Sequence, residues 1–310
     1  MNSPENTSRS NQWLEYYKKF DYFSPDNVRE DCYPGIMERE TPVDRAIVLV
    51  HGLTDSPYFL AAIADHFHNN LGYNVYLPLL HSHGLKEPKG MEGVDLKEWK
   101  ANVRFAINTA ATKADRISIG GLSTGGTLAF YMASTNNRIN GEIYLFSAAL
   151  DLAGGPLGII GEVKERLLRT FMADVLDKFD ENKPLIGRNP YRYARMDMDG
   201  AQELARLIKE TDELLDTFDA KDPFPKRVFA AHSICDKTAD IKGIRTLQKK
   251  TPQDRFVLYE ISKEFNVSHA SLVLREPIRA MNASKDESPL ENANPKFQDM
   301  MAAVTKFQMS

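Results

Sequence analysis

The stretch GGLSTGG, residues Gly120–Gly126, constrains the fold more than any other part of the chain. It places Ser123 between two pairs of glycines. The preceding residues, Arg116–Ile119, have the β-branched character of a strand, and the following residues, Thr127–Ala133, favour a helix. Glycines between a strand and a helix favour a sharp turn, so we expect this turn to present the serine side chain.

Strand and helix patterns alternate on both sides of this turn. The run Ala46–Val50 is continuously apolar, as expected of a strand buried on both faces. Further strands are predicted at 73–77, 116–119, 142–146, 228–231 and 256–259. One helix is predicted directly after the serine turn. Further helices are predicted at 58–70, 95–111, 199–216 and 241–249, and a last one ends at Phe307. This alternation predicts an α/β fold with a mostly parallel central sheet flanked by helices.

The alternation is interrupted between residues 151 and 219. This segment carries apolar residues at helical spacing and has no strand pattern, so we expect a helical insertion. Residues 1–12 are polar and are expected to form a disordered tail. Residues 13–150 and 220–310 then make up the α/β core.

Charge and composition limit the classes of partner. The 39 Lys and Arg residues oppose 43 Asp and Glu residues for a net charge of −4, and no basic block could follow a nucleic acid backbone. No apolar run is long enough to span a bilayer, and the N-terminus lacks the apolar core of a signal peptide. Two distant cysteines, Cys32 and Cys235, suit a reducing compartment. We expect a cytoplasmic protein with no nucleic acid partner and no stable membrane insertion, its oligomeric state left open.

Residues Gly121–Gly125 match the pattern G-x-S-x-G, in which a serine hydroxyl is exposed at a strained strand-to-helix turn. Residues two positions from Ser123 must be small to avoid a clash, and Gly121 and Gly125 meet that need. A phosphate-binding loop would instead require G-x-G-x-x-G or G-x-x-x-x-G-K-[ST], and neither pattern is present. The pattern therefore predicts that Ser123 is a nucleophile.

A serine nucleophile needs a base, and the base needs an orienting carboxylate. Of the seven histidines, only His269 follows the last predicted strand, in a loop that could reach Ser123. The acid should follow the strand at 228–231, where Asp236 and Asp240 are both available. Asp240 directly precedes a predicted helix, where an aspartate is more often an N-cap. Asp236 is therefore preferred, and Asp240 is the alternative.

The first buried strand ends in His51, Gly52 and Leu53. Gly52 would let the backbone turn so that the Leu53 N–H faces the nucleophile. The N–H of Thr124 would supply the second donor of an oxyanion hole. We interpret His51 as a structural residue that braces this loop.

Together these segments resemble the serine carboxylesterases of the α/β-hydrolase superfamily, in the branch of bacterial carboxylesterases and monoacylglycerol lipases. The matching stretches are VLVHGLTDSP, YLPLLHSHGLKEP with DLKEW after it, GGLSTGG, and the loops of Asp236 and His269. The resemblance covers roughly residues 43–275, apart from the insertion. It implies ester hydrolysis through an acyl-enzyme without a cofactor. It also implies a helical cap after the sixth strand, where residues 151–219 fall.

One stretch departs from the family pattern. His81, Ser82, His83 and Gly84 stand where the family commonly has G-H-G, and His81 in place of glycine would narrow the loop below the site. An H-x-H pair also fits a metal site, but no third ligand at suitable spacing accompanies it, so no metal is expected.

The resemblance predicts a serine carboxylesterase for short- or medium-chain esters, with monoacylglycerols among the candidate substrates. Many charges in residues 151–219 favour water-soluble esters over emulsified fats. The same triad also serves thioesterases, amidases and hydrolases of carbon–carbon bonds. A non-catalytic α/β-hydrolase that only binds a small ligand is the alternative from another class.

Overall fold

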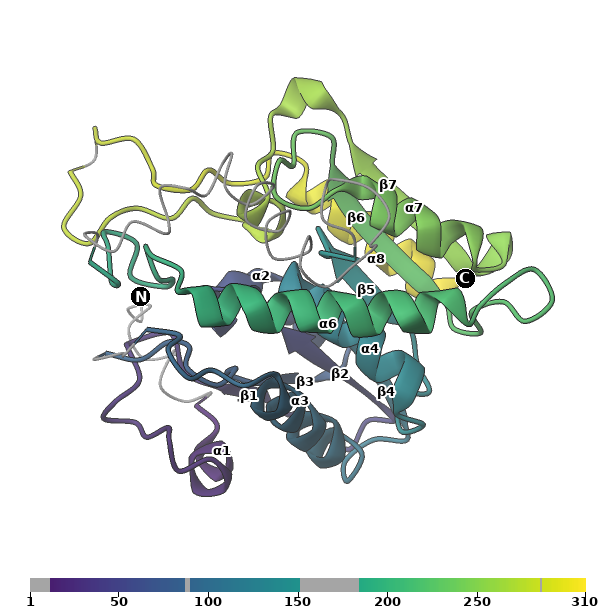
Figure 1. Ribbon diagram of the computed structural model, residues 1–310, viewed down its shortest axis with the longest axis horizontal. Coiled ribbons are helices and arrows are strands. Elements are labelled where there is room, and N and C mark those ends of the chain that lie inside the picture. Colours follow the sequence, from purple (N-terminus) through teal and green to yellow (C-terminus); the bar gives the residue numbers. More distant parts are fainter. Residues whose placement is uncertain (1–11, 87–89, 151–183, 285) are drawn as a thin grey trace.

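A mostly parallel sheet forms the centre of the molecule (Figure 1). The computed structural model describes residues 12–86, 90–150, 184–284 and 286–310. Within these ranges the sheet has seven strands in the order β1-β3-β2-β4-β5-β6-β7, and only β1 runs antiparallel to its neighbour. The strands are β1 (Gly35–Met37), β2 (Arg45–Val50), β3 (Asn74–Leu77), β4 (Arg116–Leu122), β5 (Ile143–Phe146), β6 (Val228–Ser233) and β7 (Phe256–Ile261). The predicted parallel sheet is confirmed.

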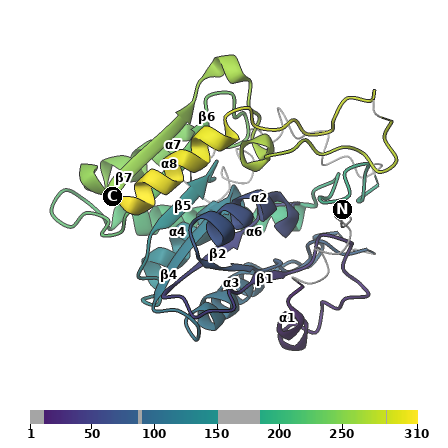
Figure 2. The same ribbon diagram turned by 180° about the vertical axis from the view of Figure 1, so that it is seen from behind.

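Helices cover both faces of this sheet. Figure 1 shows α6 crossing in front of the sheet beside α3 and α4, and Figure 2 shows α2 and α8 on the opposite face. The α-helices are α1 (Leu14–Lys19), α2 (Ala61–Asp65), α3 (Leu96–Ala110), α4 (Thr124–Thr135), α6 (Met198–Asp216), α7 (Ile241–Lys249) and α8 (Phe297–Met309). Shorter helical turns are η3 (Pro57–Leu60), η4 (His66–Asn70), η6 (Gln253–Arg255), η7 (Lys263–Phe265) and η8 (Ala270–Val273). No helix in the described ranges is both long enough and apolar enough to cross a membrane.

Strand β2 explains why a continuous apolar run marks a central strand. Val48 and Val50 face the core shared with α3 and α4, whereas Ile47 and Leu49 face the core shared with α2 and α8. Since side chains alternate across a sheet, each face of the strand needs its own apolar set.

The segment before β2 contains an element that the sequence patterns did not predict. Helix α1 places Trp13, Tyr16 and Phe20 against Phe105 of α3, with ring centroids 5.4 to 5.8 Å apart. Strand β1 follows and extends the sheet by pairing with β3. Most of the predicted N-terminal tail lies outside the described residues, and its last residue, Gln12, forms a bridge with β1.

The single helix predicted at 58–70 is three consecutive pieces, η3, α2 and the π-helical η4. Pro57 occupies the first turn of η3, where its fixed φ and missing N–H are tolerated. η4 ends at Asn70, and the Tyr73 amide then donates to the Phe67 carbonyl directly before β3.

The predicted cap, residues 151–219, lies between β5 and β6 in the chain. It therefore follows the fifth strand of the described residues, whereas the resemblance placed it after a sixth strand. Residues 151–183 lie outside the described residues. Helix α6 buries Leu204, Leu207 and Ile208 in the core that it shares with α3 and α4. The described helix of the predicted insertion therefore packs on the α/β body, and it completes the crossover that two parallel strands require.

Candidate active site

Ser123 lies at a sharp turn between β4 and α4. Its φ of 54° and ψ of −120° are strained for a residue with a side chain. A Cβ at Gly121 would overlap the backbone of Gly125, and a Cβ at Gly125 would overlap the backbone of Val50. The two glycines therefore permit the close approach that the turn needs, as predicted. The Ser123 amide donates to the Phe146 carbonyl at 3.0 Å, which ties the turn to β5.

His269 and Asp236 come from different loops and meet through a hydrogen bond. Asp236 lies between β6 and α7, and His269 directly precedes η8. The Nδ1 of His269 is 2.7 Å from Oδ2 of Asp236. The other oxygen, Oδ1, accepts the amides of Thr238 at 2.8 Å and Ala239 at 3.0 Å. The loop thereby fixes one carboxylate oxygen and leaves the other for the imidazole.

The environment of Asp236 favours its ionised form. Burial opposes the negative charge, but His269, both through its charge and through the hydrogen bond, outweighs this effect together with His232 and the Ala239 amide. The pKa of the Asp236 carboxyl is therefore held below its usual range. An ionised carboxylate at this point can hold one tautomer of the imidazole and stabilise its protonated form.

Asp240, the alternative acid, has a different role in the structure. Its carboxylate accepts the Lys242 amide at 2.9 Å and caps the N-terminus of α7. The predicted capping role of Asp240 is therefore observed.

His232 is a second histidine near Asp236 that the sequence analysis did not use. Its Nε2 is 3.8 Å from Oδ2 of Asp236 and 3.2 Å from the Ala239 carbonyl. Burial lowers the pKa of this imidazole despite the nearby carboxylate. His232 thus packs behind Asp236, whereas His269 lines the cavity with Ser123.

The turn after β2 is braced by His51, as interpreted from the sequence. The Leu80 amide donates to Nε2 of His51 at 3.1 Å, so the proton of the neutral ring lies on Nδ1. Nδ1 then donates to the Gly52 carbonyl at 2.9 Å. Because the C=O and N–H of a trans peptide point in opposite directions, this bond turns the Leu53 N–H away from His51.

Gly52 brings this turn against the nucleophile turn. A Cβ at Gly52 would lie 3.3 Å from Cβ of Ser123. Leu53 lines the same cavity as Ser123, and Thr124 is the first residue of α4, where backbone amides lack partners within the helix. The two predicted donors therefore lie on either side of the contact between the turns. The Leu53 amide belongs to the turn after β2, and the Thr124 amide directly follows Ser123.

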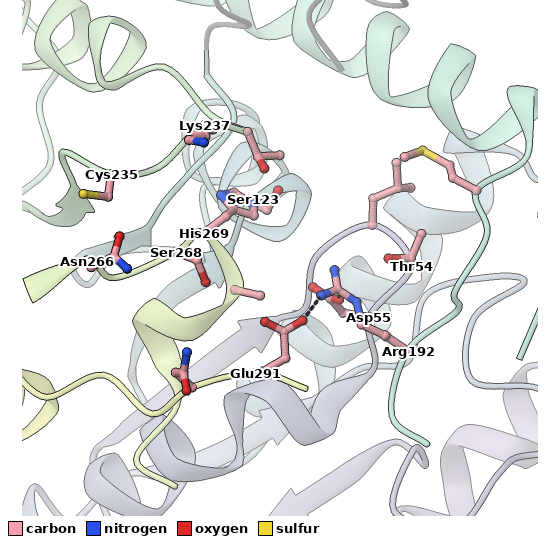
Figure 3. A pocket seen from close by; sticks show the side chains of 15 residues that line it. Thr54, Asp55, Ser123, Arg192, Cys235, Lys237, Asn266, Ser268, His269 and Glu291 are labelled. Carbon is pink, nitrogen blue, oxygen red and sulfur yellow. Dashed lines mark hydrogen bonds and ion pairs between the residues drawn. The ribbon is translucent and has the colours of Figure 1, made fainter. Parts of the chain in front are cut away.

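A cavity of about 410 Å³ opens at these residues (Figure 3). Ser123, His269 and Leu53 line it together with Arg192 and Glu291. The sequence alone does not mark Arg192 or Glu291, because a single charged residue in a polar loop carries no pattern that distinguishes it from a surface residue.

The segment that departs from the family pattern, at His81 and His83, is held by contacts to its main chain. The His81 carbonyl lies 2.9 Å from Nδ1 of His83 and accepts the Trp99 indole N–H at 3.1 Å. Burial lowers the pKa of His83 to about 4, so the ring is neutral near pH 7. The described residues hold no group of three His, Cys, Asp or Glu arranged for a metal ion.

The chain is similar in sequence to a bacterial lipase. The chain is 28% identical over 242 residues to a thermostable monoacylglycerol lipase of Bacillus sp. (strain H-257), covering 72% of this chain and 91% of that protein. No family model matches the chain.

Solved structures show the same fold. Among them are a structure from a study of the metagenome-derived lipolytic enzymes LipS and LipT and the monoacylglycerol lipase of Paleococcus ferrophilus. The first has a TM-score of 0.62 at 17% identity and covers 91% of this chain and 100% of its own. The second has a TM-score of 0.58 at 16% identity, with coverages of 89% and 97%. The resemblance drawn from the sequence is confirmed: the chain has the α/β-hydrolase fold and is similar to esterases and lipases of that fold.

Proposed function

We propose that the protein is a serine carboxylesterase that hydrolyses short- to medium-chain carboxylic esters, monoacylglycerols included, through an acyl-enzyme on Ser123. The observation that carries the proposal is the 2.7 Å hydrogen bond between His269 and Asp236, beside a cavity that His269 shares with Ser123. The similarity to a bacterial monoacylglycerol lipase supports the same reaction class.

In the proposed mechanism, the Ser123 hydroxyl attacks the ester carbonyl while Nε2 of His269 takes its proton. The negative charge that develops on the carbonyl oxygen is stabilised by the Leu53 and Thr124 amides. Asp236 stabilises the imidazolium, which then returns the proton to the leaving alkoxide. A water molecule, activated by the same imidazole, hydrolyses the acyl-enzyme and releases the acid.

The predicted cap and the cellular location also remain proposals. We propose that residues 151–219 include a helical cap that covers Ser123 and sets the preferred acyl length, since apolar pockets form between such layers. We further propose a cytoplasmic location, because the two cysteines lie far apart in the sequence and suit a reducing compartment. Trimming the cap should shift chain-length preference more than it lowers the stability of the body.

The decisive experiment measures hydrolysis of nitrophenyl esters of increasing chain length and labelling by a fluorophosphonate probe. Ser123→Ala should abolish labelling and lower turnover by roughly a million-fold, the scale seen when a triad serine is removed from subtilisin. Near wild-type turnover in a folded Ser123→Ala variant would refute the proposal.

The same experiment distinguishes the alternatives. A wild-type protein that is labelled but prefers thioesters or amides would place the activity elsewhere in the superfamily. A protein that neither hydrolyses esters nor reacts with the probe would instead be a ligand-binding α/β-hydrolase.

A further inference from the structure

Arg192 occupies the cavity wall between two carboxylates (Figure 3). Its Nη2 is 3.0 Å from Oδ1 of Asp55, and its Nη1 is 2.7 Å from Oε1 of Glu291. The guanidinium also lies 5.3 Å from the ring centroid of Phe59. Only 12% of the Arg192 side chain is exposed, so its ion pairs are shielded from water, unlike a surface salt bridge.

The main chain at residues 190–196, which carries Arg192, is itself fixed to the turn after β2. The Tyr193 amide donates to the Thr54 carbonyl at 2.8 Å, and the Tyr193 hydroxyl donates to the Ser82 carbonyl at 3.0 Å. Arg192 therefore extends from a fixed main chain, and its side chain can act as a rigid link.

The carboxylate of Asp55 joins this link to the nucleophile turn. A Cβ at Gly52 would lie 2.6 Å from Oδ2 of Asp55 on one side and 3.3 Å from Cβ of Ser123 on the other. The Asp55 carboxylate and the Ser123 side chain therefore both lie close to Gly52. The Asp55 side chain is only 3% exposed, so its charge depends on protein partners.

We propose that Arg192 is a positioning residue for the oxyanion hole, acting through Asp55 on the Gly52–Asp55 turn and hence on the Leu53 amide. The inference rests on the proposed function, because the Leu53 amide matters for rate only if an oxyanion forms at Ser123. Glu291 serves as the second anchor and ties the turn to the C-terminal loop at 286–294.

The physical reason is the cost of breaking a buried ion pair. Without Arg192, the Asp55 carboxylate loses the guanidinium beside its Oδ1, and its buried negative charge is less well compensated. We expect the carboxylate to shift, and with it the turn on which it is packed, Leu53 included. Oxyanion donors stabilise the transition state only when they are held in place before the reaction. Loss of Arg192 should therefore lower kcat and leave substrate affinity nearly unchanged.

The test compares Arg192→Met with Arg188→Met in the full-length protein. Arg188 lies four residues before Arg192, and its ion pair with Glu287 lies four residues before Glu291. The control therefore breaks a pair between the same two regions, but the Arg188 side chain is 64% exposed, so its pair is open to water. The readouts are kcat and KM with nitrophenyl esters, affinity for a trifluoromethyl ketone that forms a tetrahedral adduct, and the melting temperature.

Arg192→Met should lower kcat about 100-fold, the scale for one lost oxyanion donor, with KM changed less than about threefold. The affinity for the trifluoromethyl ketone should fall by a similar factor. Arg188→Met should keep both values. Arg192→Lys should give an intermediate kcat, because an ammonium cannot bind two carboxylates in the planar geometry of a guanidinium; this variant also serves if Arg192→Met does not fold.

Adding Asp55→Asn to Arg192→Met should not lower kcat further, since both changes break the same pair. Losses that multiply in the double variant would overturn the inference, as would wild-type kcat in a folded Arg192→Met protein or an equal loss in Arg188→Met. Failure of the proposed function looks different, because the wild-type protein would then lack esterase activity or Ser123→Ala would keep it.

Discussion

Two regions at the carboxyl edge of the sheet hold histidines whose ring nitrogens have different partners. In the loops after β2 and β3, both ring nitrogens of His51 bind main-chain groups, and Nδ1 of His83 lies beside a main-chain carbonyl. In the loops after β6 and β7, His269 binds the carboxylate of Asp236. The first pair is fully buried, whereas 14% of the His269 side chain is exposed at the cavity.

We expect this difference to separate a structural imidazole from one that can transfer a proton. Burial without a carboxylate lowers the pKa of His51 and of His83, so both rings stay neutral and hold the backbone in place. A carboxylate partner lets His269 carry a transient positive charge. Position at the edge of the sheet is therefore not enough, because the partner of the ring decides its use.

The largest expected effect comes from removing the histidine with the carboxylate. His269→Ala should lower esterase turnover by roughly a million-fold, similar to loss of the nucleophile, because the triad acts as a unit. His66→Gln is the control, since His66 binds Thr305 on α8, away from the cavity. Steady-state rates with a nitrophenyl ester decide the question. A folded His269→Ala protein with more than a hundredth of wild-type turnover would remove the distinction between the two regions.

The next effect concerns the carboxylate itself. Asp236→Asn should fold normally and lose about 10⁴-fold in turnover, the scale of the equivalent change in trypsin-like enzymes, because the amide favours the wrong tautomer of His269. Asp240→Asn should keep most activity. Both variants replace a carboxylate oxygen by an amide nitrogen, at positions four residues apart. Rates and melting curves therefore compare the two sites directly. An inactive Asp240→Asn with an active Asp236→Asn would move the acid to Asp240.

The sequence could propose Ser123, His269 and Asp236 as candidates because each has a local signal. Ser123 needs neighbouring glycines, His269 follows the last strand, and Asp236 remains once Asp240 is understood as a helix cap. The long apolar runs predicted the strands for the same reason, since burial on both faces demands them.

What the sequence did not predict depends on contacts between distant segments. The link from Arg192 to Asp55 and Glu291 joins residues more than 90 positions apart, and nothing in the local pattern specifies it. Helix α1 spans six residues and is held by aromatic packing on α3, so its propensity alone would not mark it.

The two regions should also respond to acid in different pH windows. His83 has a folded pKa of about 4 against about 6.5 when unfolded, so the unfolded state binds more protons between these values. The contribution of the neutral His83 ring to the free energy of unfolding should be fully present above about pH 6.5. The free energy of unfolding should then fall by up to about 3 kcal/mol toward pH 4, and His51 should act in the same direction. Asp236 has a depressed pKa, so its contribution is present above its unfolded value of about 3.9 and is lost only at lower pH.

Urea unfolding of the wild-type protein and of His83→Gln at several pH values between 7 and 4 tests the upper window. The variant cannot titrate at this position, so its stability should change less over the range. An identical pH dependence in both proteins would mean that His83 is not the group responsible.

The smallest expected effect concerns Asp240, which differs from Asp236 in what it holds. Its carboxylate accepts the Lys242 amide at 2.9 Å, and an asparagine oxygen can accept the same bond. The additional contact with the Lys242 ammonium, at 3.3 Å, joins a lysine side chain that is 72% exposed, where ion pairs contribute little. Asp240→Asn should therefore lower stability by at most about 1 kcal/mol, and Asp240→Ala by about 1 kcal/mol through loss of the cap. Thermal melts together with esterase rates measure both variants. A loss well above 2 kcal/mol, or a large loss of activity in Asp240→Asn, would show that this carboxylate supports more than the start of α7.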